Sequence, residues 1–138
     1  MFSRFKSLFA KPPPVEFRDA QLGVLTLDCG VWIGAVQHDG RKLGFVVGGT
    51  DSGPDSGLLA CVRTLLARFA DTERKAVEVL RSRESEIRQA RLSFYSFEFL
   101  WGEKPEDFCF EFFADGDDSR VWRVEFVAGQ PSQTGFDD

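Results

Sequence analysis

The sequence predicts an α+β domain: a largely antiparallel sheet of about seven strands with two helices packed on one face. Two stretches, residues 15–48 and 92–127, alternate apolar and polar side chains as strands do, whereas residues 58–90 between them follow helical spacing. The expected order is therefore four strands, two helices and three strands. With 138 residues, 43% of them hydrophobic and 28% charged, the chain is long enough for one folded domain.

The first four strands end in a hairpin. Val15–Arg18 and Gly23–Asp28 alternate, and the runs 31–37 and 42–47 flank Asp39-Gly40, a dipeptide typical of a two-residue type I′ turn. Such a turn places His38 opposite Arg41. The same register sets Gly34 opposite Phe45, whose ring can cover the bare glycine. It also sets Val36 opposite Leu43 and Trp32 opposite Val47.

Two helices follow a glycine-rich loop at residues 48–57. The loop lacks the lysine of a phosphate-binding loop, and we expect Asp55 or Ser56 to cap the first helix. That helix has a wide apolar stripe formed by Leu58, Leu59, Val62, Leu65, Leu66 and Phe69. The second is expected from about Thr72 to Ala90, capped by Asp71 or Thr72, with a thin apolar stripe and a Glu84–Arg88 ion pair.

The last strands are rich in aromatic residues. One face is expected to hold Tyr95, Phe97, Phe99 and Trp101. Two later runs alternate as strands, and setting Phe112 opposite Trp122 also pairs Phe110 with Val124 and Phe108 with Phe126. This register requires an odd loop of three or five residues around 115–118, with room for a bulge.

The chain divides into three parts. Residues 1–14 form a basic amphipathic segment, predicted as a short helix with Phe2, Phe5 and Phe9 on one side, followed by three prolines. Residues 15–128 form the α+β domain, and residues 129–138 an acidic C-terminal tail. We expect the N-terminal segment to pack on its own domain or in a partner's groove; docking on a membrane surface is the less favoured alternative.

The charge of the chain excludes one class of partner. The net charge is −5, and residues 98–138 hold 11 acids against 3 bases, a balance that disfavours nucleic-acid binding. Three scattered cysteines (Cys29, Cys61 and Cys109) and one histidine provide neither a disulfide scaffold nor a metal site. We expect free thiols that pack as small hydrophobic residues, a cytoplasmic location, no cofactor, no metal and no catalytic constellation.

The acidic last third supplies the candidate binding residues. Asp115, Asp117 and Asp118 lie in a predicted turn, and Asp137 and Asp138 end the chain. They can steer a basic partner protein to the domain, or they can serve only to keep an aromatic-rich sheet soluble. The turn lacks the frame and the bidentate glutamate of a calcium loop. Phe2, Phe5 and Phe9 are the candidates for docking on a membrane or a partner.

Short motifs along the chain resemble a known group of domains. They are Phe17-x-Asp19-x-x-Leu22-Gly23, Trp32 in an early strand, a helical middle, Val121-Trp122-Arg123-Val124-Glu125-Phe126, Gly129-x-Pro131 and the terminal aspartates. This plan resembles small bacterial α+β domains of unknown function, some of them encoded beside toxins as immunity proteins. The resemblance implies a protein-binding role without catalysis, and it assigns no functional residue.

The function expected from these observations is a non-enzymatic module that binds another protein, such as an immunity-type inhibitor of a basic partner. The module would be a monomer or a homodimer. Two alternatives remain open. One is a small ligand-binding protein or enzyme with a pocket lined by Trp32, Trp101 or Trp122. The other is an acidic dimer similar to a secretion chaperone.

Overall fold

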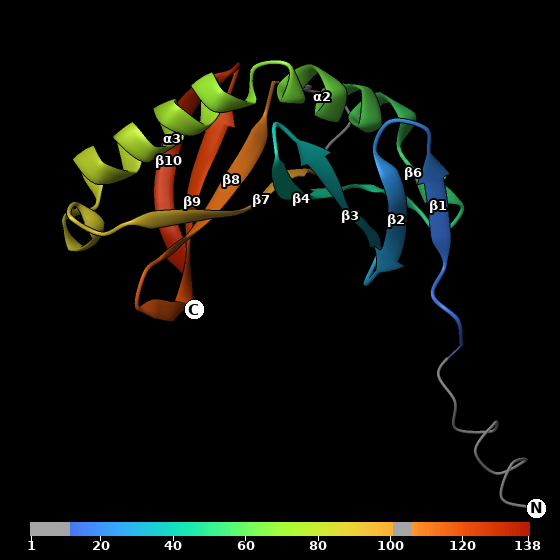
Figure 1. The fold of residues 1–138 in the computed structure, drawn as a ribbon, viewed down its shortest axis with the longest axis horizontal. Helices are drawn as coiled ribbons and strands as arrows, with labels where there is room; N and C mark the ends of the chain where they lie inside the picture. Colours follow the sequence, from blue (N-terminus) through green and yellow to red (C-terminus); the bar gives the residue numbers. More distant parts are fainter. Residues whose placement is uncertain (1–11, 101–105) are drawn as a thin grey trace, which may run out of the picture.

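Two antiparallel meanders of four strands each join into one eight-stranded sheet (Figure 1). The computed structural model describes residues 12–100 and 106–138. The strand order is β1-β2-β3-β4-β7-β8-β9-β10, and the central pair β4 and β7 is parallel. The eight strands are β1 (Glu16–Asp19), β2 (Gly23–Asp28), β3 (Val31–His38), β4 (Arg41–Val47), β7 (Leu92–Phe99), β8 (Phe108–Ala114), β9 (Asp117–Val127) and β10 (Gln130–Asp137).

The connection between the meanders contains both helices, because parallel neighbours need a long crossover. It runs through a small hairpin of β5 (Gly49–Thr50) and β6 (Gly53–Pro54), then α2 (Ser56–Leu66), α3 (Phe69–Arg83) and the 3₁₀ turn η1 (Ser85–Ile87). Figure 1 shows α2 above the first meander and α3 above the second. The predicted class, an α+β domain with two helices on a mainly antiparallel sheet, is therefore confirmed.

The eighth strand was not expected. Residues 130–137, predicted as part of an acidic tail, form β10, which pairs antiparallel with β9 at the edge of the sheet. Ala128 and Gly129, with φ values of +52° and +77°, make the tight turn between the two strands. The segment has too few apolar residues to show strand alternation, although the ring of Phe136 packs with its centroid 5.1 Å from that of Trp122.

The β3–β4 hairpin has the predicted register. Asp39 and Gly40 have φ values of +48° and +76°, as a type I′ turn requires. Gly34 pairs with Phe45, and a Cβ on Gly34 would lie 2.6 Å from the tip of that ring. The predicted cover of the glycine by the phenylalanine is confirmed.

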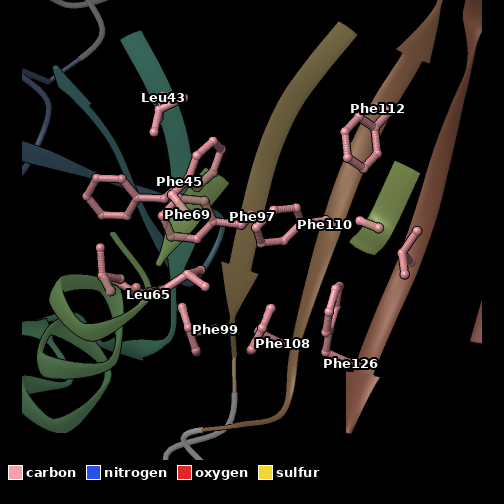
Figure 2. Packing of buried hydrophobic residues seen from close by; sticks show 14 of the residues in the cluster. Leu43, Phe45, Leu65, Phe69, Phe97, Phe99, Phe108, Phe110, Phe112 and Phe126 are labelled. Atoms are coloured by element: carbon pink, nitrogen blue, oxygen red, sulfur yellow. The ribbon is translucent and has the colours of Figure 1, made fainter. Parts of the chain in front are cut away.

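The core lies between the sheet and the helices, and phenylalanine is its most frequent residue. Phe45, Phe97 and Phe110 lie side by side on adjacent strands, with ring centroids 5.8 and 5.9 Å apart (Figure 2). From α3, Phe69 covers this row, 5.6 Å from Phe110. Trp122 and Phe126 extend the core onto β9, and both are buried.

The helix boundaries differ from the prediction. Asp55 caps α2 as expected, since its carboxylate accepts a hydrogen bond from the Leu58 amide at 2.9 Å. The chain breaks at Arg68, so Phe69 begins α3 and does not end α2. The second helix ends at Arg83, well before Ala90. Glu84 leaves the helical conformation and accepts a hydrogen bond from Thr134 on β10 at 2.9 Å, so it does not pair with Arg88.

Two irregularities alter the aromatic strands. A bulge between Phe94 and Ser96 moves Tyr95 off the buried face and puts Phe94 on it, so the predicted face is wrong at its start. The pairing of Phe112 with Trp122 is confirmed, but the turn has two residues, 115 and 116, and a register shift after Phe112 supplies the extra residues. Trp101 and the N-terminal residues Phe2, Phe5 and Phe9 lie outside the described residues.

Candidate functional site

One face of the sheet has no described element packed on it, and we call it the open face. The helices and the β5–β6 hairpin lie on the other side, where the Trp32 indole N–H donates to the Thr50 carbonyl at 2.8 Å. Large apolar side chains are exposed on the open face: Val24 at 37%, Ile33 at 40% and Tyr95 at 53%. An uncovered sheet face with exposed apolar side chains offers area for contact with another protein.

Charged side chains gather on the β7–β10 half of the open face. Strand pairing sets Glu98, Cys109 and Glu125 in one row across β7, β8 and β9. The neighbouring row sets Glu111 opposite Arg123. Asp137 on β10 has the same orientation as Gly135, which pairs with Arg123. We call this group the acidic face: Glu98, Glu111, Arg123, Glu125 and Asp137.

A single arginine serves three carboxylates of the acidic face. The Arg123 guanidinium lies 3.2 Å from Asp137, 3.7 Å from Glu98 and 3.9 Å from Glu111. Of these contacts, the one to Asp137 is also a hydrogen bond. The group therefore has an excess of negative charge that no other described cation balances within 4 Å.

Glu111 is the most unusual member of the group. Only 6% of the residue is exposed, although a glutamate is rarely so buried. Burial and the neighbouring Glu98 carboxyl raise the pKa of Glu111 to about 8. Glu111 therefore stays largely protonated, and so uncharged, around neutral pH. A cation brought to the face from outside would favour the release of that proton.

Two shallow hollows adjoin on the acidic face. The first, of about 200 Å³, is lined by Glu98, Leu100, Asp107, Arg123, Glu125 and neighbouring residues. The second, of about 170 Å³, shares Arg123 and Glu125 and extends to Asp137. Both are smaller than typical small-molecule sites, which measure roughly 300–1,000 Å³. Their size and charge suit a single basic side chain of a macromolecular partner.

The acids predicted from the sequence lie at one end of this surface. Asp115 is in the β8–β9 turn, and Asp118 follows that turn on β9. On β10, Asp137 pairs with Val121, four residues after Asp117, the first residue of β9. Figure 1 shows the C terminus beside that turn. Asp137 belongs to the acidic face, and Asp118 and Asp138 are exposed at its end.

Some of the predicted acids already have contacts within the chain. Arg120 binds Asp117 at 2.8 Å, and the Ser119 hydroxyl donates to the same carboxylate at 2.6 Å. Hydrogen bonds from Ser119 and Arg120 lower the pKa of Asp117 to about 2. Asp115 accepts from the Ser93 hydroxyl at 3.3 Å. Asp117 therefore braces the turn, whereas Asp118 is exposed to a partner.

Sequence reasoning did not identify Glu98, Glu111, Arg123 and Glu125 as a group. The signal was present in the predicted register, because the pairing that sets Phe112 opposite Trp122 also sets Glu111 opposite Arg123. A glutamate between two phenylalanines in an otherwise apolar strand was the second signal. The contact with Asp137 was hidden, because it depends on β10 being a strand.

The thiols and tryptophans form no comparable site. Burial raises the pKa of Cys109 to about 12, and burial also raises the pKa of Cys61. Cys29 is exposed in the β2–β3 turn and does not pack as a hydrophobic residue there, contrary to the prediction. Trp32 and Trp122 are buried in the core, and neither lines any of the cavities described here.

Comparison with models of protein families, with curated proteins and with solved structures finds no match for this chain. Across residues 12–100 and 106–138, no helix has the length and apolar character needed to cross a membrane. In the same ranges, no group of three histidine, cysteine or acidic side chains is placed to hold a metal ion.

Proposed function

We propose that this protein is a non-enzymatic protein-binding module that holds a basic partner protein on its open face, in the manner of an immunity-type inhibitor. The observation that carries the proposal is the acidic face, where three carboxyl groups contact one arginine and Glu125 lies in the neighbouring row of the uncovered sheet. An arginine or lysine of the partner would supply the missing positive charge. Charge-assisted hydrogen bonds to carboxylates are among the strongest polar contacts at interfaces.

The rest of the open face would add apolar contacts. Val24 and Ile33 are exposed on the first meander, while Tyr95 packs against Phe113 at 4.9 Å on the second. An interface of this kind combines an apolar area with charges that orient the partner. Asp118 and Asp138 would act at its margin, mainly by accelerating the encounter with a basic surface.

The charge also argues for a partner of a different kind from the chain itself. A symmetric dimer formed through this face would bring two acidic faces together. Like charges in close contact are unfavourable, so a basic protein is the better occupant than a second copy. Three free cysteines support a cytoplasmic location, where thiols stay reduced.

The test begins with capture of partners by the full chain from lysate of its own cell. A captured protein is then purified, and its Kd is measured for the native chain and for an Asp118→Lys/Glu125→Lys double variant. Both residues are exposed, so the substitutions leave the core intact. We expect a basic partner whose binding weakens by about tenfold or more in the variant and falls with added salt.

The control is Asp51→Lys, an equal reversal of charge at an exposed residue in the turn between β5 and β6. It should leave the Kd within about twofold of the native value. Three outcomes count against the proposal: no partner is captured, the partner is acidic, or the double variant binds as well as the control.

A further inference from the structure

A separate cavity lies on another surface, between α3 and the starts of β4 and β7. It measures about 720 Å³, within the range of ligand-binding clefts. Leu92, Phe94 and Phe112 provide apolar surface, and Val77 closes it from α3. We call it the β4–β7 groove. It shares no lining residue with the hollows of the acidic face.

The groove exists because the two central strands separate. β4 pairs with β7 only from Gly44 and Ser96 onward, although both strands begin earlier. The bulge at Tyr95 turns the first half of β7 away from β4, as bulges bend the strands that contain them. Figure 1 shows the start of β7 lying apart from β4, below α3.

The first half of β7 therefore presents a free edge to the groove. The Asp115 amide donates to the Arg91 carbonyl at 2.9 Å, so residue 91 bonds toward β8. In an antiparallel pair the bonding direction alternates, which turns the backbone N–H and C=O groups of Leu92 and Phe94 away from β8 and toward the groove. In the part of the chain that the structure describes, no strand pairs with them on that side.

The rim of the groove is basic although the chain as a whole is acidic. Its two acids are already matched, because Glu73 binds Arg41 through two hydrogen bonds and Glu78 binds Arg74 at 2.9 Å. Three further cations line the groove: Lys42, Arg81 and Arg91.

None of these three cations has a close carboxylate partner. Arg81 donates to the carbonyls of Arg88 and Ala90, which leaves its charge uncompensated. Arg91 has only Asp115, at 4.0 Å, and its side chain is 86% exposed. No described carboxylate lies within 4 Å of Lys42.

We propose that the β4–β7 groove binds an extended acidic peptide segment, which adds as a strand to the free edge of β7. Its backbone would bond to Leu92 and Phe94, as in other cases of strand addition. Side chains alternate along a strand, so one set would rest on Leu92 and Phe94 while the other placed carboxylates beside Lys42 and Arg91. The site would thus discriminate acidic from basic peptides.

The probe is a fluorescent peptide of about eight residues that alternates glutamate and phenylalanine, with a lysine-phenylalanine peptide for comparison. Binding to the full chain is followed by fluorescence anisotropy. We expect the acidic peptide to bind at least about tenfold more tightly than the basic one. N-methylation of alternate peptide amides should abolish binding when it falls on the edge facing β7, and have little effect on the other edge.

The variant is Lys42→Glu/Arg91→Glu, with Arg18→Glu on β1 as the matched reversal of charge far from the groove. The double variant should bind the acidic peptide at least about tenfold more weakly and the control within about twofold of the native chain. Equal binding of both peptides, indifference to both N-methylated series, or equal loss in the control would overturn the proposal. The acidic face is unchanged in these variants, so the outcome is independent of the function proposed above.

Discussion

Arg123 lies directly opposite Glu111 on the open face, 3.9 Å from a carboxylate that is almost completely buried. The same guanidinium also contacts Glu98 and Asp137. Where buried carboxyl groups outnumber the cations beside them, a carboxyl group favours its protonated form over its ionised form. The acidic face therefore reaches its full negative charge only when a cation binds there or the pH rises.

This relationship predicts how stability depends on pH. The pKa of Glu111 rises from its ordinary value of 4.5 to about 8 in the folded chain. Between these values the folded chain holds a proton that the unfolded chain releases, so the free energy of unfolding falls as the pH rises. Glu111→Gln removes this proton exchange, so the variant should gain stability relative to the native chain as the pH rises from about 5 to about 8.

Urea unfolding of both proteins between about pH 5 and about pH 8 checks this expectation. Glu125→Gln, a change at an exposed residue of the same face, serves as the control and should follow the native curve. If the Glu111→Gln curve runs parallel to the native one over this range, Glu111 does not hold the proton.

Because Phe45 lies so close to Gly34, adding a single methyl group at position 34 should destabilise the fold. A Cβ on Gly34 would lie 2.6 Å from the Phe45 ring and 3.1 Å from Leu25, and both side chains are fully buried. Gly34→Ala should therefore lower the free energy of unfolding by about 1–3 kcal/mol, the usual cost of overpacking. Gly135→Ala is the control, because its Cβ would meet nothing within 4 Å. Equal stability of the two variants would contradict the packing.

The ring of Phe136 on the edge strand β10 is expected to contribute to the stability of the fold. Phe136 packs 5.1 Å from Trp122, and Arg120 lies over both rings at 5.1 Å. Phe136→Ala should lower the free energy of unfolding by roughly 1–2 kcal/mol, because it uncovers a buried tryptophan. Val127→Ala removes a side chain that is 50% exposed and should have almost no effect. If thermal unfolding gives the two variants the same melting temperature, the Phe136 ring contributes little to the stability of the fold.

Removing the N-terminal cap of α2 should lower the stability of the fold by a smaller amount. The Asp55 carboxylate satisfies the Leu58 amide at the start of the helix. Asp55→Ala should cost about 1 kcal/mol, whereas Asp55→Asn should retain most of the stability because an amide oxygen also accepts the bond. Chemical denaturation of the two variants measures the difference, and an equal loss in both would mean that the charge, and not the hydrogen bond, matters.

Local chemistry explains why part of the fold was predictable. The Asp39-Gly40 turn fixes the register of its hairpin, and the apolar faces of both strands agree with it. The pairing of Phe112 with Trp122 followed from the same kind of agreement. In both cases turn residues and side-chain alternation indicated one register only.

The rest depended on tertiary contacts that leave weak local signals. Phe69 fits the apolar stripe of the first helix, yet it begins the second because its ring packs on Phe110. Tyr95 follows strand alternation until a bulge removes it from the buried face. The acidic face required β10, whose polar residues gave no strand pattern, so only Asp137 of its five members was predicted from the sequence to be a binding residue.

The footprint of the partner on the sheet shows directly which face of the protein it binds. Methyl NMR spectra of the full chain are recorded before and after addition of the captured basic partner. We predict that the methyl signals of Val24, Ile33 and Val127, all on the open face, shift or broaden, while those of Leu58 and Val62 on α2 stay unchanged. Changes confined to α2 and α3 would show that the partner binds the helical side, and would contradict binding on the open face.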